Sequence, residues 1–76
     1  MKLDRATDSY CKKVATRVTE RRKAAGLSIN RLSEMAGISQ SMMSYIEQGR
    51  SIPTIGTLYR IAKALETSPD ELLGGI

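Results

Sequence analysis

The chain contains no histidine and only one cysteine, Cys11, among its 76 residues. A single cysteine excludes an internal disulfide, and the lack of histidine removes the usual ligand set of a structural zinc site. Neither a Ser-His nor a Cys-His catalytic pair can form, and no phosphate-cradling glycine loop occurs. The sequence therefore predicts a protein that is not an enzyme and that holds no metal or cofactor.

Long apolar segments are also missing, since no run approaches the roughly 20 apolar residues that a membrane span needs. The N-terminal sequence MKLD is too polar for a secretory signal. We therefore expect a cytoplasmic protein without a membrane partner.

Length and charge narrow the possible partners. At 76 residues, folding hides only about 60% of the unfolded surface, which supports one core and hence one domain. Twelve Lys or Arg against eight Asp or Glu give a net charge of +4. This balance favours a polyanionic partner such as nucleic acid, although charge alone does not identify it.

Caps, glycines and apolar spacing divide the chain into five helices and no strand. Glycines 26, 37, 49 and 74 each follow a helical segment, and Pro53 and Pro69 stand at helix starts. The predicted helices cover about residues 10–25, 29–36, 39–48 and 55–65, followed by a short helix from Pro69. Residues 1–9 are predicted to be an N-terminal arm or frayed turn, and residues 10–76 the domain.

Helical periodicity also predicts the buried faces. The predicted core residues of the first, second and fourth helices are Tyr10, Val14, Val18, Leu32, Met35, Ala36, Ile55, Leu58, Ile61, Ala62 and Leu65.

The helix over 39–48 has an apolar arc and an uncharged polar arc. At about 100° per residue, Met42, Met43 and Ile46 gather on one side. Amides and hydroxyls suit the edges of bases, whereas a solvated helix face usually carries Lys and Glu. A plain solvent-exposed face fits the same residues. The polar arc consists of Gln40, Ser41, Ser44, Tyr45 and Gln48.

Several segments at fixed spacing resemble the phage-repressor and Cro-like (Xre-type) helix-turn-helix family. They are GLS at 26–28, AGIS at 36–39, IEQG at 46–49 and LYRIAKAL at 58–65, and the resemblance covers about residues 14–73. It implies an all-α, compact five-helix bundle of the lambda-repressor-like type, with the third helix in the major groove. It also implies a transcriptional regulator, such as a repressor, that binds a pseudo-palindromic site on double-stranded DNA as a homodimer.

The resemblance also assigns roles to single residues. Glu47 and Arg22 match an acid and an arginine that form a structural ion pair, and Gly37 matches the turn glycine. The base-contacting positions of the family are occupied by Gln40, Ser41, Ser44 and Tyr45.

The start of the second helix departs from the family. Ile29 replaces a frequent glutamine and offers a phosphate only its backbone N–H, but Asn30 and Arg31 lie in the same turn, at the positive end of the helix dipole. The predicted phosphate contacts are Ser28, Ile29, Asn30, Arg31, Arg17 and Arg50.

The apolar C-terminus leaves two interpretations open. Leu73 and Ile76 are predicted to form a two-fold dimer contact, or else to cap the core of their own chain. The alternative function is a protein-interaction module on the same fold, either an antitoxin that neutralises a toxin or a partner of another regulator. Apolar surface outside the core would favour that alternative.

Overall fold

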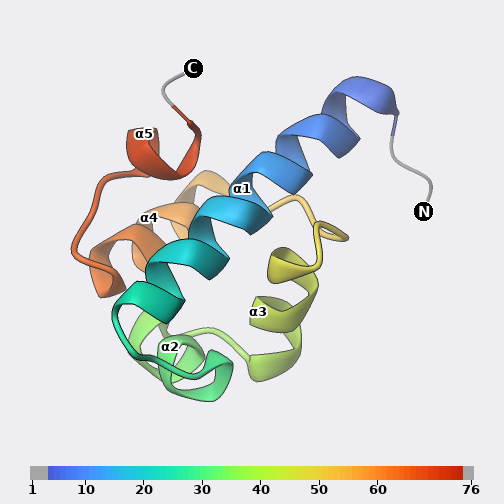
Figure 1. Ribbon diagram of the computed structural model, residues 1–76. Coiled ribbons are helices and arrows are strands. Elements are labelled where there is room, and N and C mark those ends of the chain that lie inside the picture. Colours follow the sequence, from blue (N-terminus) through green and yellow to red (C-terminus); the bar gives the residue numbers. More distant parts are fainter. Residues whose placement is uncertain (1–3, 75–76) are drawn as a thin grey trace.

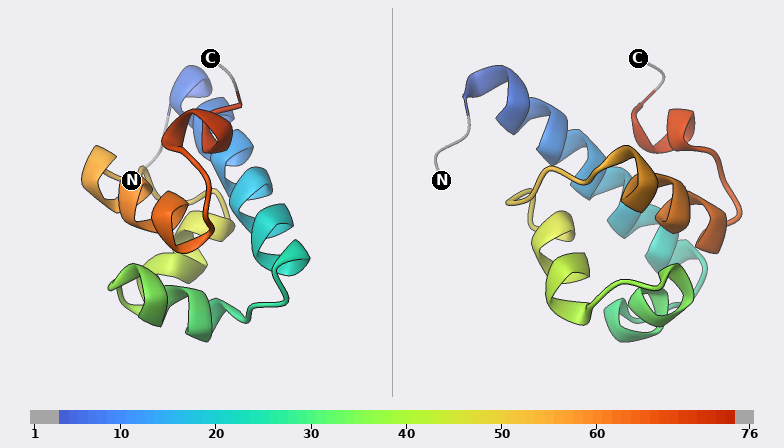
Figure 2. Two further views of the ribbon diagram at one scale, coloured as in Figure 1. Left: turned by 90° about the vertical axis from the view of Figure 1, so that its left-hand side faces the viewer. Right: turned by 180° about the vertical axis from the view of Figure 1, so that it is seen from behind.

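A computed structural model describes residues 4–74, and within this range the chain forms five helices (Figure 1). They are α1 (Arg5–Ala24), α2 (Ile29–Ala36), α3 (Gln40–Glu47), α4 (Ile55–Ala64) and α5 (Pro69–Leu72). The long helix α1 packs against α3 and α5, α2 packs against α3 and α4, and α4 packs against α5 (Figure 2). This arrangement confirms the predicted all-α bundle.

All five helices contribute to one hydrophobic core. Burial of each large apolar side chain stabilises the fold by about 1.5–3 kcal/mol, so these contacts hold the helices together. The fully buried side chains include Val14, Val18, Leu32, Met43, Ile46, Ile61 and Leu72. Within the part of the chain that the structure describes, no helix has both the length and the apolar character of a membrane span.

A polar side chain caps the start of every helix by accepting a hydrogen bond from a backbone N–H three residues later. Such a cap contributes about 1 kcal/mol. Four of the starts lie where the sequence predicted them, within one residue. The caps are Asp4, Ser28, Ser39, Thr54 and Ser68.

The start of α1 corrects the prediction for residues 1–9. Arg5 to Ser9 are helical, because Asp4 accepts a hydrogen bond from the Thr7 N–H at 2.7 Å. This hydrogen bond holds the pKa of the Asp4 carboxyl below its usual value. Lys12 and Asp8 form an ion pair at 3.0 Å in the next turn. Ala6 is the one apolar residue between Arg5 and Ser9, so apolar periodicity carried no signal there. Residues 1–3 lie outside the described range.

Two apolar residues predicted to be in the core, Met35 and Ile55, are exposed, as is Met42 on the apolar arc of α3. Met35 and Met42 keep 45% and 43% of their surface, and Ile55 keeps 86%. In each case the apolar arc of the helix is wider than the strip that neighbouring helices cover. For Ile55 the cause is its place in the first turn of α4, which forms an edge of the molecule (Figure 2).

Each of the five described helices is followed by one residue in a left-handed backbone conformation. After α1, α2, α3 and α4 the next N–H donates to a carbonyl five residues back, as from Ile38 to Ser33 at 3.0 Å and from Thr67 to Ala62 at 2.9 Å. The left-handed residue is a glycine after α1, α2, α3 and α5, as predicted. After α4 it is Glu66, with φ of 57°, where a side chain is strained.

A buried ion pair fastens α3 to α1. Arg22 Nε and Nη2 donate to the two carboxylate oxygens of Glu47 at 2.7 and 3.1 Å. Thr19 Oγ1 donates to the same carboxylate at 2.9 Å, and Arg22 Nη1 donates to the Leu27 carbonyl at 2.8 Å. The two charged side chains are only 13% and 6% exposed, so solvent does not replace these bonds. The pairing expected from the sequence is present.

Glu47→Ala is expected to lower the free energy of unfolding by about 3–5 kcal/mol, because it leaves the Arg22 guanidinium buried without its charge partner. Urea denaturation measures this loss. Glu20→Ala, at an exposed position of α1, is the matched control and is expected to stay within about 0.5 kcal/mol of the parent. A Glu47→Ala loss below about 1 kcal/mol would contradict the account, since that is the range of solvent-exposed pairs.

Glu66→Gly is expected to raise the free energy of unfolding by about 0.5–1 kcal/mol, because glycine adopts the left-handed conformation without strain. The same substitution at Glu20, inside α1, serves as the control of opposite sign and is expected to cost about 1 kcal/mol. Thermal or urea unfolding of both variants compares them directly. Destabilisation by Glu66→Gly would show that this turn is not strained.

Candidate nucleic-acid interface

Helices α2 and α3 meet at a sharp corner formed by Gly37, Ile38 and Ser39. Gly37 has φ of 71°, and its N–H donates to the Glu34 carbonyl. The Ser39 side chain then caps α3 by accepting from the Met42 N–H at 3.0 Å. Since α2 ends and α3 begins within three residues, the corner is rigid and turns one side of α3 away from the bundle.

The inner side of α3 is buried and its outer face is open. Met43 and Ile46 are buried in the core, and Glu47 is held by Arg22. The outer face of α3 consists of Gln40, Ser41, Ser44, Tyr45 and Gln48, all exposed except the half-buried Ser44. It keeps its polar and uncharged character in the folded protein, and Tyr45 is half exposed.

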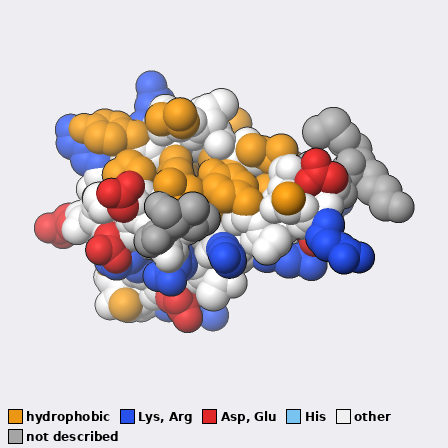
Figure 3. Space-filling view, turned by 90° about the horizontal axis from the view of Figure 1, so that it is seen from above, with side chains coloured by type: hydrophobic (Ala, Val, Ile, Leu, Met, Phe, Trp, Pro, Cys, Tyr) orange, Lys and Arg blue, Asp and Glu red, His pale blue; other side chains and the backbone are white. Residues whose placement is uncertain are grey.

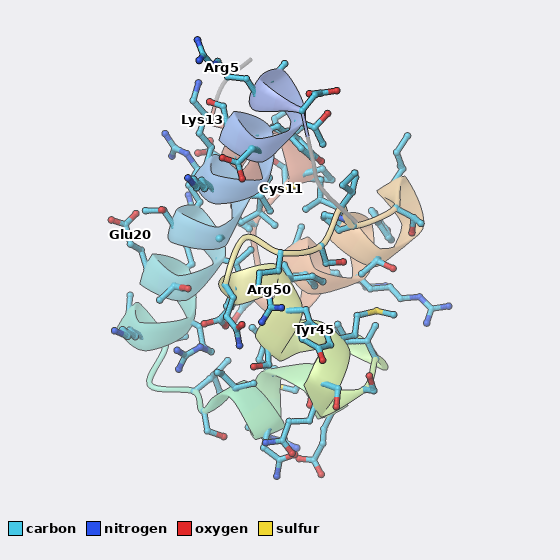
Figure 4. The ribbon with its side chains drawn as sticks, turned by 90° about the vertical axis from the view of Figure 1, so that its right-hand side faces the viewer. Arg5, Cys11, Lys13, Glu20, Tyr45 and Arg50 are labelled. Carbon is cyan, nitrogen blue, oxygen red and sulfur yellow. The ribbon has the colours of Figure 1, made fainter. Side chains whose placement is uncertain are left out.

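Arg50 and Tyr45 lie next to each other on this face (Figure 4) and belong to a connected group of side chains over its C-terminal half. Gln48 Nε2 donates to Ser44 Oγ at 3.0 Å, and Arg50 Nη1 donates to Gln48 Oε1 at 3.4 Å. The Arg50 guanidinium carbon lies 5.6 Å from the centre of the Tyr45 ring. Sequence reasoning placed Gln48 on the polar arc but not among the contact residues, and it did not connect Arg50 with Tyr45.

The start of α2 presents the residues predicted for phosphate contact. Ser28 accepts from the Arg31 N–H at 3.0 Å, and Asn30 and Arg31 are exposed. Ile29 is half-buried against the core, so its side chain faces inward. Arg31 forms a loose, exposed ion pair with Glu34 at 3.7 Å.

Arg17 lies away from this surface. Thr19 and Arg22 mark the side of α1 that faces α3, and Arg17 is turned roughly 160° from Thr19 about the helix axis. Its guanidinium packs beside Gly74, next to α5. The structure therefore does not bring Arg17 together with the other predicted phosphate contacts.

The predicted dimer residues and the exposed apolar residues do not coincide. Leu73 is half-buried and packs against the core of its own chain, and Ile76 lies outside the described residues. Hydrophobic side chains nevertheless form a broad band on the face seen from above (Figure 3). Three large exposed ones lie at or near the start of α4, here named the α4 cluster: Ile52, Ile55 and Tyr59.

Comparison with known proteins identifies the family of this chain and several relatives. The family model HTH_3, described as helix-turn-helix, matches residues 18–72. The HTH-type transcriptional regulator SutR of Escherichia coli is 38% identical over 68% of this chain. The cryptic phage CTXphi transcriptional repressor RstR of Vibrio cholerae is 37% identical over 82% of it. This chain spans only 29% of SutR and 55% of RstR.

A solved structure of similar fold contains DNA. The P22 c2 repressor in complex with a synthetic operator superposes with a TM-score of 0.77 at 33% identity. The match covers 83% of this chain and 96% of the repressor chain. The family resemblance seen in the sequence is thus confirmed, and the chain belongs to the HTH_3 helix-turn-helix family of phage-repressor and Cro-like type.

Proposed function

We propose that this chain is a sequence-specific DNA-binding transcriptional regulator whose α3 enters the major groove. The observation that carries the proposal is the uncharged polar outer face of α3, which projects from the bundle on a rigid corner. Amide and hydroxyl groups can bond to base edges there. The P22 c2 repressor, solved with its operator, supports the same role for the fold. The proposed base contacts are Gln40, Ser41, Ser44 and Tyr45.

Phosphate contacts at the start of α2 would set the position of α3. The first N–H groups of a helix have no partner within the helix, so those of Ile29 and Asn30 are available to an oxyanion. Arg31 adds a positive charge, and its side chain is 63% exposed. Because phosphates are the same at every base pair, these contacts contribute affinity without sequence preference.

Gln40→Ala is expected to relax base preference at one position of each half-site by about 1–3 kcal/mol, because a glutamine pairs with a particular base edge. Arg31→Ala is expected to weaken binding to all sequences alike and to reduce the log–log salt slope by about 0.9 for each protomer bound, which is about 1.8 for a dimer on two half-sites. Shift assays with a selected duplex and its single-base variants at several salt concentrations measure both effects. An unchanged preference in Gln40→Ala would contradict the assigned face.

The homodimer is proposed to form through the α4 cluster and not through Leu73. The molecule measures 31 × 26 × 20 Å, and half-sites lie roughly 34–36 Å apart on one side of DNA. Two copies with α3 in successive major grooves are therefore close neighbours, and their surface side chains can meet if the longest dimension of each copy runs along the DNA. Ile55 and Tyr59 lie four residues apart on one side of α4, with 86% and 55% of their surfaces exposed. Burial against a second copy would remove this apolar surface from water.

Ile55→Asp is expected to shift the protein towards monomer and to weaken binding to a two-half-site duplex at least tenfold, while binding to one half-site is unchanged. The cause is the cost of burying a charge at the centre of the contact. Analytical ultracentrifugation with and without DNA measures the proportion of monomer and dimer. Met35→Asp, at an exposed position of α2, is the control. A parent chain that stays monomeric on a symmetric duplex would leave the cluster free for another protein, as the antitoxin-type alternative requires.

A further inference from the structure

Arg50 is exposed, and its side chain lies over the outer face of α3. Its backbone N–H donates to the Tyr45 carbonyl at 3.0 Å, across the left-handed turn at Gly49. Its guanidinium then stacks over the Tyr45 ring at 5.6 Å and bonds to Gln48 Oε1 at 3.4 Å (Figure 4). The side chain is therefore held at the surface proposed to face the bases.

The bonds that hold Arg50 leave most of its donors free. A guanidinium carries five N–H groups in a planar fork, and among the described residues only its donor atom Nη1 is engaged in a hydrogen bond, to Gln48, while its carbon lies over the Tyr45 ring. The remaining N–H groups are available to a ligand with two adjacent acceptors. Gln48 is itself fixed by its bond to Ser44, so the guanidinium is oriented before any ligand binds.

Guanine presents two such acceptors, O6 and N7, side by side in the major groove. The amides and hydroxyls on the rest of the outer face can recognise other bases, but only the guanidinium has the donor fork that suits guanine. We propose that Arg50 recognises a guanine in each half-site, and that Tyr45 and Gln48 are the positioning residues that aim it. The inference rests on the proposed function and replaces the phosphate contact that the sequence predicted for Arg50.

Arg50→Lys separates the two roles, because lysine keeps the charge that a phosphate needs but loses the planar fork that guanine needs. Selection of bound duplexes from a random pool compares the parent, Arg50→Lys and Arg50→Ala. Both variants are expected to lose the guanine at one position of each half-site, where discrimination falls about 5- to 150-fold, while the rest of the consensus persists. The salt slope of Arg50→Lys is expected to match that of the parent.

Two further substitutions test the positioning role of the ring. Tyr45→Phe keeps the ring under the guanidinium, so the guanine preference is expected to persist, whereas Tyr45→Leu is expected to weaken it. Combining Tyr45→Leu with Arg50→Lys is expected to reduce discrimination at the guanine position little further than Arg50→Lys alone. Arg31→Lys is the matched control, since it changes an arginine of α2 and is expected to leave the consensus unchanged.

The possible failures are distinguishable. A parent chain that selects no sequence would overturn the proposed function itself. If the parent selects a consensus that Arg50→Lys leaves intact, only the assignment of Arg50 is overturned. Uniform weakening of all sequences by Arg50→Ala, with the salt slope reduced by about 0.9 for each protomer bound, would show that Arg50 contacts phosphate and not guanine.

Discussion

The bonds between Glu47 and Arg22 determine where α3 points. Because the carboxylate receives two bonds from the guanidinium and a third from Thr19, neither rotation nor sliding of α3 along α1 is possible without breaking a buried bond. The cost of such an unpaired charge is a large fraction of the 5–15 kcal/mol by which a domain is usually stable. The inner side of α3 is therefore committed to the bundle, and its outer face is left as a fixed surface.

The sequence predicted the framework of this surface because the signals are local. Caps and left-handed glycines act within one turn of chain, so the bounds of α2 and α3, the start of α5 and the corner at Gly37 followed from a few residues each. The start of α1 was missed although its cap, Asp4, is equally local. The prediction for this helix relied on apolar periodicity, and the residues directly after Asp4 show none. The left-handed conformation of Glu66 was not predicted, because this conformation is expected at glycine and the position holds a glutamate.

What the sequence did not predict depends on contacts between distant elements. Periodicity gives the direction of a side chain about its helix axis, but whether another helix covers that direction is a matter of packing, as Met35 and Ile55 show. Leu73 packs in its own chain because α5 lies against α1 and α4. The contact of Arg50 with Tyr45 and Gln48 depends on the side-chain conformations that these residues adopt on either side of the turn at Gly49. A sequence pattern does not predict such conformations.

The outer face of α3, which the Glu47–Arg22 pair holds in a fixed orientation, is proposed to be the surface that contacts DNA. Titration of the isotope-labelled protein with its selected duplex, followed by amide chemical shifts in NMR, tests this most directly. The account predicts that the largest shifts lie in residues 40–50 and at the start of α2, with a second, smaller set at the start of α4 if two copies meet there. Shifts confined to α5 and the side of α1 that carries Arg17 would contradict it.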